Sequence, residues 1–143
     1  MAYVYYSKVL DVPADKVWSI VRDFGALPKW FPFVEKSVLS NGGASGQVGT
    51  IRSNTVDKGE IIEEQLLELS DRDRRIVYAV ISGDVPTKDY SATLTVHEVI
   101  ADNRSFVEWS AQFDVDGELA PVAEWIRTGI FQTCLDELER ILS

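Results

Sequence analysis

The spacing of the apolar residues changes along this chain, and the order of those changes constrains the fold more than any other feature. Residues 2–10 are rich in Tyr and Val and end at a proline-containing break, which predicts a strand. From Ala14 to Phe24 apolar residues recur every three or four positions, which predicts a helix that packs through one side. The segment from Gly25 to Phe33 carries two prolines among its aromatic residues, so we expect a turn-rich element that packs its rings into the core.

Six further strand-like segments follow, separated by short turns rich in Gly, Asn and Asp. They are Val34–Ser40, Val48–Val56, Glu60–Leu69, Arg75–Ser82, Tyr90–Ile100 and Ser105–Val115. Connections of hairpin length predict an antiparallel meander. The connection that begins at Asn41-Gly42-Gly43 runs on to Gly46, and we interpret it as a turn, not a phosphate-binding loop, because it joins two strands.

The last segment predicts a long amphipathic helix that begins near Pro121. Its apolar stripe comprises Val122, Ile126, Ile130, Leu138 and Ile141. At about 1.5 Å per residue it would span roughly 30 Å. A bent, twisted sheet cannot follow a straight helix along its whole length, so a space remains between the two layers. The sequence therefore predicts one α+β domain over residues 1–143. In it a curved, seven-stranded antiparallel sheet surrounds the long C-terminal helix, and short helices follow the first strand.

Charge and composition argue against several kinds of partner. The net charge of −9 disfavours nucleic acid, whose binding needs clustered Lys and Arg. No apolar run approaches the roughly 18 residues of a membrane helix, and the first residues lack a secretory pattern, so we expect a soluble cytoplasmic protein without stable membrane insertion. The single cysteine, Cys134, and the single histidine, His97, cannot form a zinc cluster. We interpret them as a core thiol and a strand-surface imidazole, and we expect no metal.

Three stretches carry a family resemblance. The run from Val17 to Phe24, the motif Gly49-Thr50-Ile51-Arg52, and the segment from Gly83 to Tyr90 followed by Thr95-Val96-His97 resemble the START-like, or SRPBCC, superfamily. That superfamily includes polyketide cyclases and dehydrases, plant abscisic-acid receptors and the onion lachrymatory-factor synthase. The resemblance implies a helix-grip fold that holds a hydrophobic ligand between the sheet and the C-terminal helix. Some members are carriers or receptors, and others are enzymes that need no cofactor.

The resemblance also implies roles for polar residues. Arg52 matches the arginine of the Gly-x-x-Arg motif, Glu64 matches a pocket glutamate and Tyr90 matches a pocket tyrosine. In the synthase the equivalents of these three residues are implicated in proton transfer. Glu108 matches a pocket glutamate of the hormone receptors.

The receptor motifs themselves are replaced in this chain. Their gate and latch correspond to Val56–Gly59 and Val85–Thr87, and the position of their carboxylate-pairing lysine falls in the apolar stretch Lys29–Phe33. We therefore do not expect a hormone receptor.

Alternation along the strands tests the candidate residues independently of the resemblance. Tyr90 begins a row of apolar residues at every second position, as an inward-facing residue of a half-buried strand should. Around Glu64 the alternation is ambiguous or contains a bulge. If Glu108 faced inward, Trp109 and its apolar neighbours would face solvent. Parity therefore favours the opposite orientation for Glu108, or an apolar patch that a second copy covers in a homodimer.

These residues leave three functions open. The first is binding of a lipid, polyketide-like or isoprenoid-like molecule with Arg52, Glu64 and Tyr90 as polar anchors. The wall of that pocket would comprise Tyr78, Val80, Leu94, Ile130 and Phe131, with Glu108 added by the resemblance. The second is a cofactor-independent cyclase, dehydratase or isomerase in which Glu64 moves a proton, Arg52 stabilises charge and Tyr90 donates its hydroxyl. The third is an interaction module that docks through the strand of Trp109.

Bulky and charged residues in these patterns also have purely structural interpretations. Arg52 and Glu64 form, in the alternative interpretation, a buried ion pair that fixes the sheet. We interpret Trp18, Trp30 and Trp125 as core anchors.

Overall fold

The computed structural model describes residues 1–40 and 44–143, and the turn expected at Asn41-Gly42-Gly43 lies outside them. The chain begins with strand β1 (Ala2–Leu10), helix α1 (Ala14–Val21) and the short 3-10 turn η1 (Leu27–Lys29). The strands that follow are β2 (Val34–Leu39), β3 (Ile51–Val56), β4 (Ile61–Ser70), β5 (Arg75–Ser82), β6 (Lys88–Val99) and β7 (Arg104–Asp114), with the turn η3 (Asp57–Gly59) between β3 and β4. The C-terminal helix consists of α2 (Leu119–Glu124), the π-helical η4 (Trp125–Gln132) and α3 (Thr133–Leu142). The predicted order of elements is confirmed.

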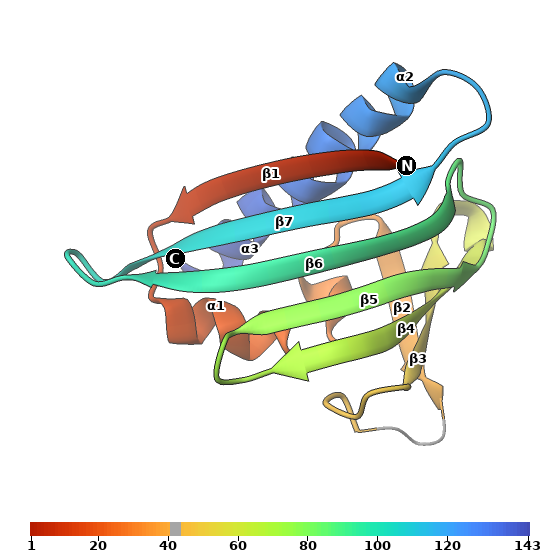
Figure 1. Cartoon of the computed structure of the whole chain (residues 1–143). Coiled ribbons are helices and arrows are strands. Elements are labelled where there is room, and N and C mark those ends of the chain that lie inside the picture. Colours follow the sequence, from red (N-terminus) through yellow and green to blue (C-terminus); the bar gives the residue numbers. More distant parts are fainter. Residues whose placement is uncertain (41–43) are drawn as a thin grey trace.

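The strands of the described residues form one antiparallel, seven-stranded sheet in the order β1-β7-β6-β5-β4-β3-β2. Figure 1 shows the long C-terminal helix lying across one face of this bent sheet. Register shifts interrupt β4 between Glu63 and Glu64 and again after Leu66, and a third lies in β6 between Lys88 and Ser91. Such bulges bend a strand and increase its twist, which explains the curvature around the helix. The α+β helix-grip architecture is therefore confirmed, and of the two explanations for the broken alternation around Glu64 the bulge is correct.

Two predicted boundaries are wrong for local reasons. Strand β3 begins at Ile51 and not at Val48, because Gly49 adopts a φ of +95° and the Thr50 N–H bonds to the Gln47 carbonyl, which forms a turn just before Ile51. Helix α1 ends at Val21 and not at Phe24, because the Asp23 N–H bonds to the carbonyl three residues earlier and tightens the last turn.

The π-helical segment η4 changes which residues of the C-terminal helix face the core. In a π-helix each hydrogen bond reaches five residues back, so one more residue is accommodated per turn than the α-helical spacing allows. Ile126 and Phe131, five positions apart, are both fully buried. Counted on from Phe131, the buried residues of α3 are Cys134, Leu135 and Leu138, so Leu138 is buried as predicted. Ile141 is 37% exposed, and its neighbour Leu142 packs against the core in its place. The prediction that Ile141 belongs to the core stripe is wrong for this reason, whereas Cys134 is buried as predicted.

Trp109 of β7 lies at the centre of the core and is only 1% exposed. Its ring stacks on Phe131 at 4.3 Å between centroids and lies 5.4 Å from Trp30. The opposite orientation that parity favoured for Glu108 is confirmed. The apolar docking patch around Trp109 is not present, which corrects the interaction-module hypothesis and removes the reason given for a homodimer there. Trp18 and Trp30 are buried core anchors, as predicted.

Among the residues that the structure describes, no helix combines the length and apolar character needed to cross a membrane.

Candidate functional site

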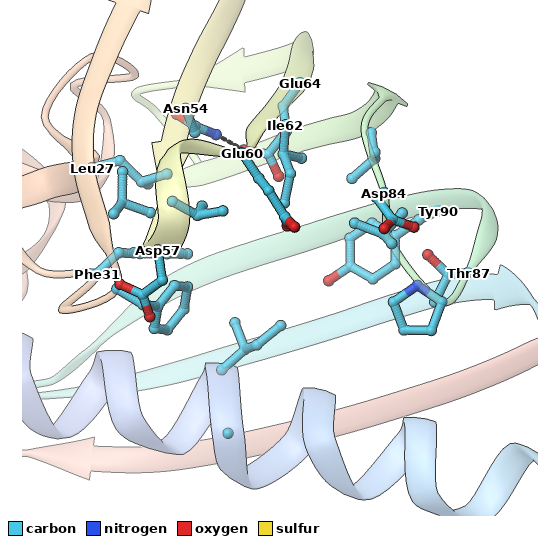
Figure 2. A pocket seen from close by; sticks show the side chains of 18 of the residues that line it. Leu27, Phe31, Asn54, Asp57, Glu60, Ile62, Glu64, Asp84, Thr87 and Tyr90 are labelled. Carbon is cyan, nitrogen blue, oxygen red and sulfur yellow. Dashed lines mark hydrogen bonds between the residues drawn. The ribbon is translucent and has the colours of Figure 1, made fainter.

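A cavity of about 580 Å³ opens between the C-terminal helix and the curved part of the sheet. Its wall is formed by elements distant in the sequence: the segment around η1, strands β3 to β6, the two loops that join β3 to β4 and β5 to β6, and η4. Most of the wall is apolar or aromatic. Phe31 and Leu27 line one end, and Figure 2 shows the hydroxyl of Tyr90 directed into the hollow. The space predicted between the sheet and the helix therefore exists.

Buried polar groups at the inner end of the cavity come from paired strands. Arg52 of β3 lies opposite Glu64 of β4 in the strand register. The Arg52 Nε donates to Glu64 Oε1 at 2.8 Å, and Asn54 Nδ2 donates to the same oxygen at 2.8 Å. Arg52 also donates from Nη1 to the Phe24 carbonyl at 3.1 Å. Both of the carboxylate's bonds use Oε1, and within the described residues no bond is formed by Oε2, so one Glu64 oxygen is free to meet a ligand.

The positive charge of this pair lies behind the cavity wall. Glu64 and Asn54 line the cavity, whereas Arg52 lines a small adjoining void of about 10 Å³ together with core residues. The Arg52 guanidinium carbon lies 4.0 Å from the centroid of the Phe24 ring and 4.9 Å from that of Tyr78, which are cation–π distances. Arg52 is 3% exposed. It therefore compensates Glu64 without reaching the ligand space itself.

Two tyrosine hydroxyls complete the polar part of the wall. Trp109 Nε1 donates to the Tyr78 hydroxyl at 3.2 Å. Burial raises the pKa of Tyr78 well above its ordinary value of 10, and burial likewise raises the pKa of Tyr90. Tyr90 itself lies in the bulge between Lys88 and Ser91, beside Asp89 with its φ of +51°, at the start of the inward row of β6. Both hydroxyls are therefore neutral groups that donate hydrogen bonds and do not act as bases.

The helix side of the cavity is formed by the π-helical segment. Trp125, Gly129 and Ile130 line the cavity. A Cβ added to Gly129 would lie 3.0 Å from the Trp125 Cδ1, so glycine at this position lets the indole lie against the helix. Trp125 is 45% exposed. The interpretation of Trp125 as a core anchor is therefore wrong, because η4 directs this residue towards the mouth of the cavity.

The loops at the mouth carry charged side chains that the sequence interpretation did not identify. Asp57, Lys58 and Glu60 belong to the β3–β4 connection, and Asp84 belongs to the β5–β6 connection. All four are exposed. Parity along β3, which puts Asn54 on the same face as Arg52, would have identified Asn54, but nothing in the alternation of strands reveals what two loops contribute.

The predicted site residues divide into three groups. Those that line the cavity are Glu64, Tyr78, Val80, Tyr90 and Ile130. Arg52 and Leu94 line the small adjoining void, and Phe131 is fully buried against Trp109. The structure thus brings five of the predicted residues together around one space and puts three in the core beside it.

Glu108 lies outside the cavity altogether. It projects from the outer face of β7, where it accepts hydrogen bonds from the Tyr5 hydroxyl and pairs with His97 Nε2, both at 2.7 Å. The bond from Tyr5, followed by that from His97, lowers the pKa of Glu108. Because Trp109 faces inward, its neighbour must face outward. The assignment of Glu108 as a ligand-binding residue is corrected accordingly, whereas His97 is a surface imidazole, as predicted.

No group of three or more His, Cys, Asp or Glu side chains is gathered for a metal ion in the part of the chain that the structure describes.

Comparisons with known proteins agree with this architecture. A family model described as polyketide cyclase / dehydrase and lipid transport matches residues 1–143. The abscisic acid receptor PYL7 of Arabidopsis thaliana is 33% identical over 112 residues, which are 76% of this chain and 52% of the receptor. The chain thus spans about half the length of this curated relative. The START-like resemblance noted in the sequence is confirmed.

Solved structures share the fold over nearly the whole chain. The protein XoxI of Bacillus cereus superposes with a TM-score of 0.86 at 27% identity and covers 99% of this chain and 96% of its own. Norcoclaurine synthase of Thalictrum flavum superposes with a TM-score of 0.75 at 22% identity, covering 99% of this chain and 93% of its own. At that identity the second likeness concerns the fold alone.

Proposed function

The chain belongs to the polyketide cyclase / dehydrase and lipid transport family, and from this premise we propose that it binds one small, largely apolar molecule between its sheet and its C-terminal helix. The observation that carries the proposal is the cavity of about 580 Å³. Ligand pockets typically measure roughly 300–1,000 Å³ and combine an apolar wall with a few convergent polar groups. This cavity has that size and that composition.

The distribution of wall residues suggests how the molecule lies. Its apolar body would contact Phe31, Val80 and Ile130, and burying apolar surface yields about 25 cal/mol per Å². A hydroxyl group on the inner part of the molecule would meet the free oxygen of Glu64 and the hydroxyl of Tyr90, and a second polar group could lie nearer the mouth. Lipids, polyketide-like and isoprenoid-like molecules combine a large apolar body with a few such polar groups.

A second function is favoured by one observation at the same end of the cavity. Glu64 has one unpaired oxygen and Tyr90 retains its proton, so a base and a hydrogen-bond donor face the same space. In this alternative Glu64 removes a proton from a carbon next to a carbonyl group, Tyr90 stabilises the oxygen, and Arg52 compensates the charge of Glu64. The reaction would be a cofactor-independent cyclisation, dehydration or isomerisation. Glu64→Gln should then abolish turnover and leave binding intact, and full activity of that variant would remove Glu64 from the mechanism.

Binding is tested with N-phenyl-1-naphthylamine, an uncharged probe whose fluorescence rises in apolar surroundings. Val80→Trp should fill part of the cavity and weaken binding at least tenfold. The matched control is Val77→Trp, the same change on the same strand but on its outer face. Val77→Trp should bind as the wild type does. Unchanged binding in Val80→Trp, with both variants folded by circular dichroism, would contradict the proposal.

The natural ligand is sought separately. Native mass spectrometry of the purified protein should show an adduct that denaturation releases and that tandem mass spectrometry can identify.

A further inference from the structure

We infer that the molecule bound in this cavity is a cationic amphiphile, with a protonated amine at the end nearest the mouth. The inference rests on the proposed binding function and specifies its ligand class. The charged residues on the wall, within the described part of the chain, are four carboxylates and one ammonium group. They are Asp57, Glu60, Glu64 and Asp84, against Lys58.

The carboxylates at the mouth are not neutralised by the protein. Asp57, Glu60 and Asp84 form no ion pair with any residue in the ranges 1–40 and 44–143, whereas other surface carboxylates, such as Asp71, Asp116 and Asp136, are paired with a Lys or Arg. Figure 2 shows their carboxylates around the same hollow, although they come from two different loops. Charges of one sign at the edge of a low-dielectric cleft focus the field into it. The mouth is therefore negative where a ligand enters.

Among the described residues that line the cavity, none offers an anionic ligand a free positive charge further in. Arg52 is already bonded to Glu64 at 2.8 Å and lies behind the wall. Lys58 is exposed and is flanked in its own loop by Asp57 and Glu60. Transferring a carboxylate from water into an apolar site without a partner is strongly unfavourable. The cavity thus disfavours acids, whereas the similar receptor PYL7 is named for an acid.

Aromatic rings add to the preference for a cation. Tyr90, Trp125 and Phe31 all line the cavity, and the face of an aromatic ring attracts an ammonium group within about 6 Å. The apolar body can then occupy the inner part of the cavity while the ammonium group stays near the mouth. Of these rings Trp125 lies at the mouth with the carboxylates, so the ring and the carboxylates act at the same end of the ligand, and charge should alter affinity without altering where the body lies.

The test compares three ligands with the same ten-carbon chain: decylammonium, decanol and decanoate. Each displaces N-phenyl-1-naphthylamine at pH 7 and below its micellar concentration. One exposed charge pair changes an affinity by a factor of roughly two to five, so three carboxylates should favour decylammonium over decanoate by about tenfold or more at low salt. The difference should shrink at high salt, where the screening length falls to about 3 Å at 1 M. Decanol should lie between the two.

Variants that remove charge test which carboxylates cause the preference for decylammonium over decanoate. A triple variant with Asp57→Asn, Glu60→Gln and Asp84→Asn should bring the two charged ligands to within about threefold of each other. The control triple variant, Glu35→Gln, Glu98→Gln and Asp102→Asn, removes the same charge from positions outside the cavity wall and should keep the order of the three ligands.

Two results would overturn the inference but leave the binding function standing. The first is that decanoate binds as tightly as decylammonium. The second is that the control triple variant loses the preference for decylammonium as fully as the mouth variant does. If decanol displaces the probe in either case, the binding function itself still stands. If none of the three ligands displaces the probe, the binding function fails, and the inference fails with it.

Discussion

Replacing Arg52 by methionine should cost this protein about 4 kcal/mol of unfolding free energy. The substitution keeps most of the apolar volume but removes the donor that lies 2.8 Å from Glu64 Oε1. Glu64 then stays buried with one amide donor, Asn54, and removing one member of a buried ion pair typically costs about 3–5 kcal/mol. The lost contact between the guanidinium and the Phe24 ring would add up to about 1 kcal/mol.

Urea unfolding followed by tryptophan fluorescence measures this loss. With an m-value of about 2 kcal/mol/M for a chain of this size, the midpoint should fall by about 2 M. The double variant Arg52→Met/Glu64→Leu removes both charges, and apolar replacements of buried ion pairs are often neutral or stabilising. It should therefore regain at least about 2 kcal/mol relative to Arg52→Met, although the Asn54 amide loses an acceptor worth about 1 kcal/mol.

The reasoning would be refuted by a loss below about 1 kcal/mol in Arg52→Met. Such a value would mean that water entering through the cavity solvates Glu64, so that the pair behaves like an exposed one. The inner end of the cavity would then be wet, and the proposed anchoring of a ligand at Glu64 would lose its energetic basis.

Two further predictions concern positions away from the ion pair. The hydrogen bond from Tyr5, then that from His97, lowers the pKa of Glu108 below its ordinary value of 4.5, so the stability that this group contributes is present above that value and is lost as the pH falls through the lowered pKa. Between pH 6 and pH 3 the urea midpoint of the wild type should therefore fall further than that of Glu108→Gln. Equal falls in the two proteins would contradict the stabilising role assigned to Glu108. Gly129→Ala should displace the Trp125 indole, since the added Cβ would lie 3.0 Å from its Cδ1, while the higher helix propensity of alanine preserves or raises stability by up to about 1 kcal/mol. Probe affinity should change in this variant and not in Thr128→Ala, and an unaltered affinity in Gly129→Ala would show that the indole does not contact the ligand.

The arrangement of elements could be predicted because apolar spacing reports directly on secondary structure. Alternation identified the inward row of β6 that begins at Tyr90, and it also indicated the irregularity around Glu64. Against the family resemblance for Glu108 it favoured an outward Glu108, with an apolar dimer patch as the alternative, and the structure shows the first of these, with Trp109 buried. Period-two spacing is a physical consequence of strand geometry and so holds even where a motif is misleading.

The parts of the site that escaped prediction are those that spacing does not encode. Which residues of the C-terminal helix face the core after Ile126 depends on a π-helical segment. The sequence of η4 contains no signal that predicts this π-helical geometry. The mouth depends on how two loops, around Asp57 and Asp84, approach each other in space. Both features follow from tertiary packing and not from local propensity, which explains why Trp125 was misplaced and why the mouth carboxylates were not recognised.

The C-terminal helix contributes unequally to the core along its length, and the cavity lies along its looser part. Helix α2 has no buried residue, η4 buries Ile126 and Phe131, and α3 buries Cys134, Leu135 and Leu138. The cavity is lined by residues of η4 that lie between its two buried positions or just before them. A ligand therefore contacts the stretch of helix in which few side chains are committed to packing against the sheet. Substitutions there should change affinity at little cost in stability, whereas equivalent substitutions in α3 should unfold the protein before they reveal anything about binding.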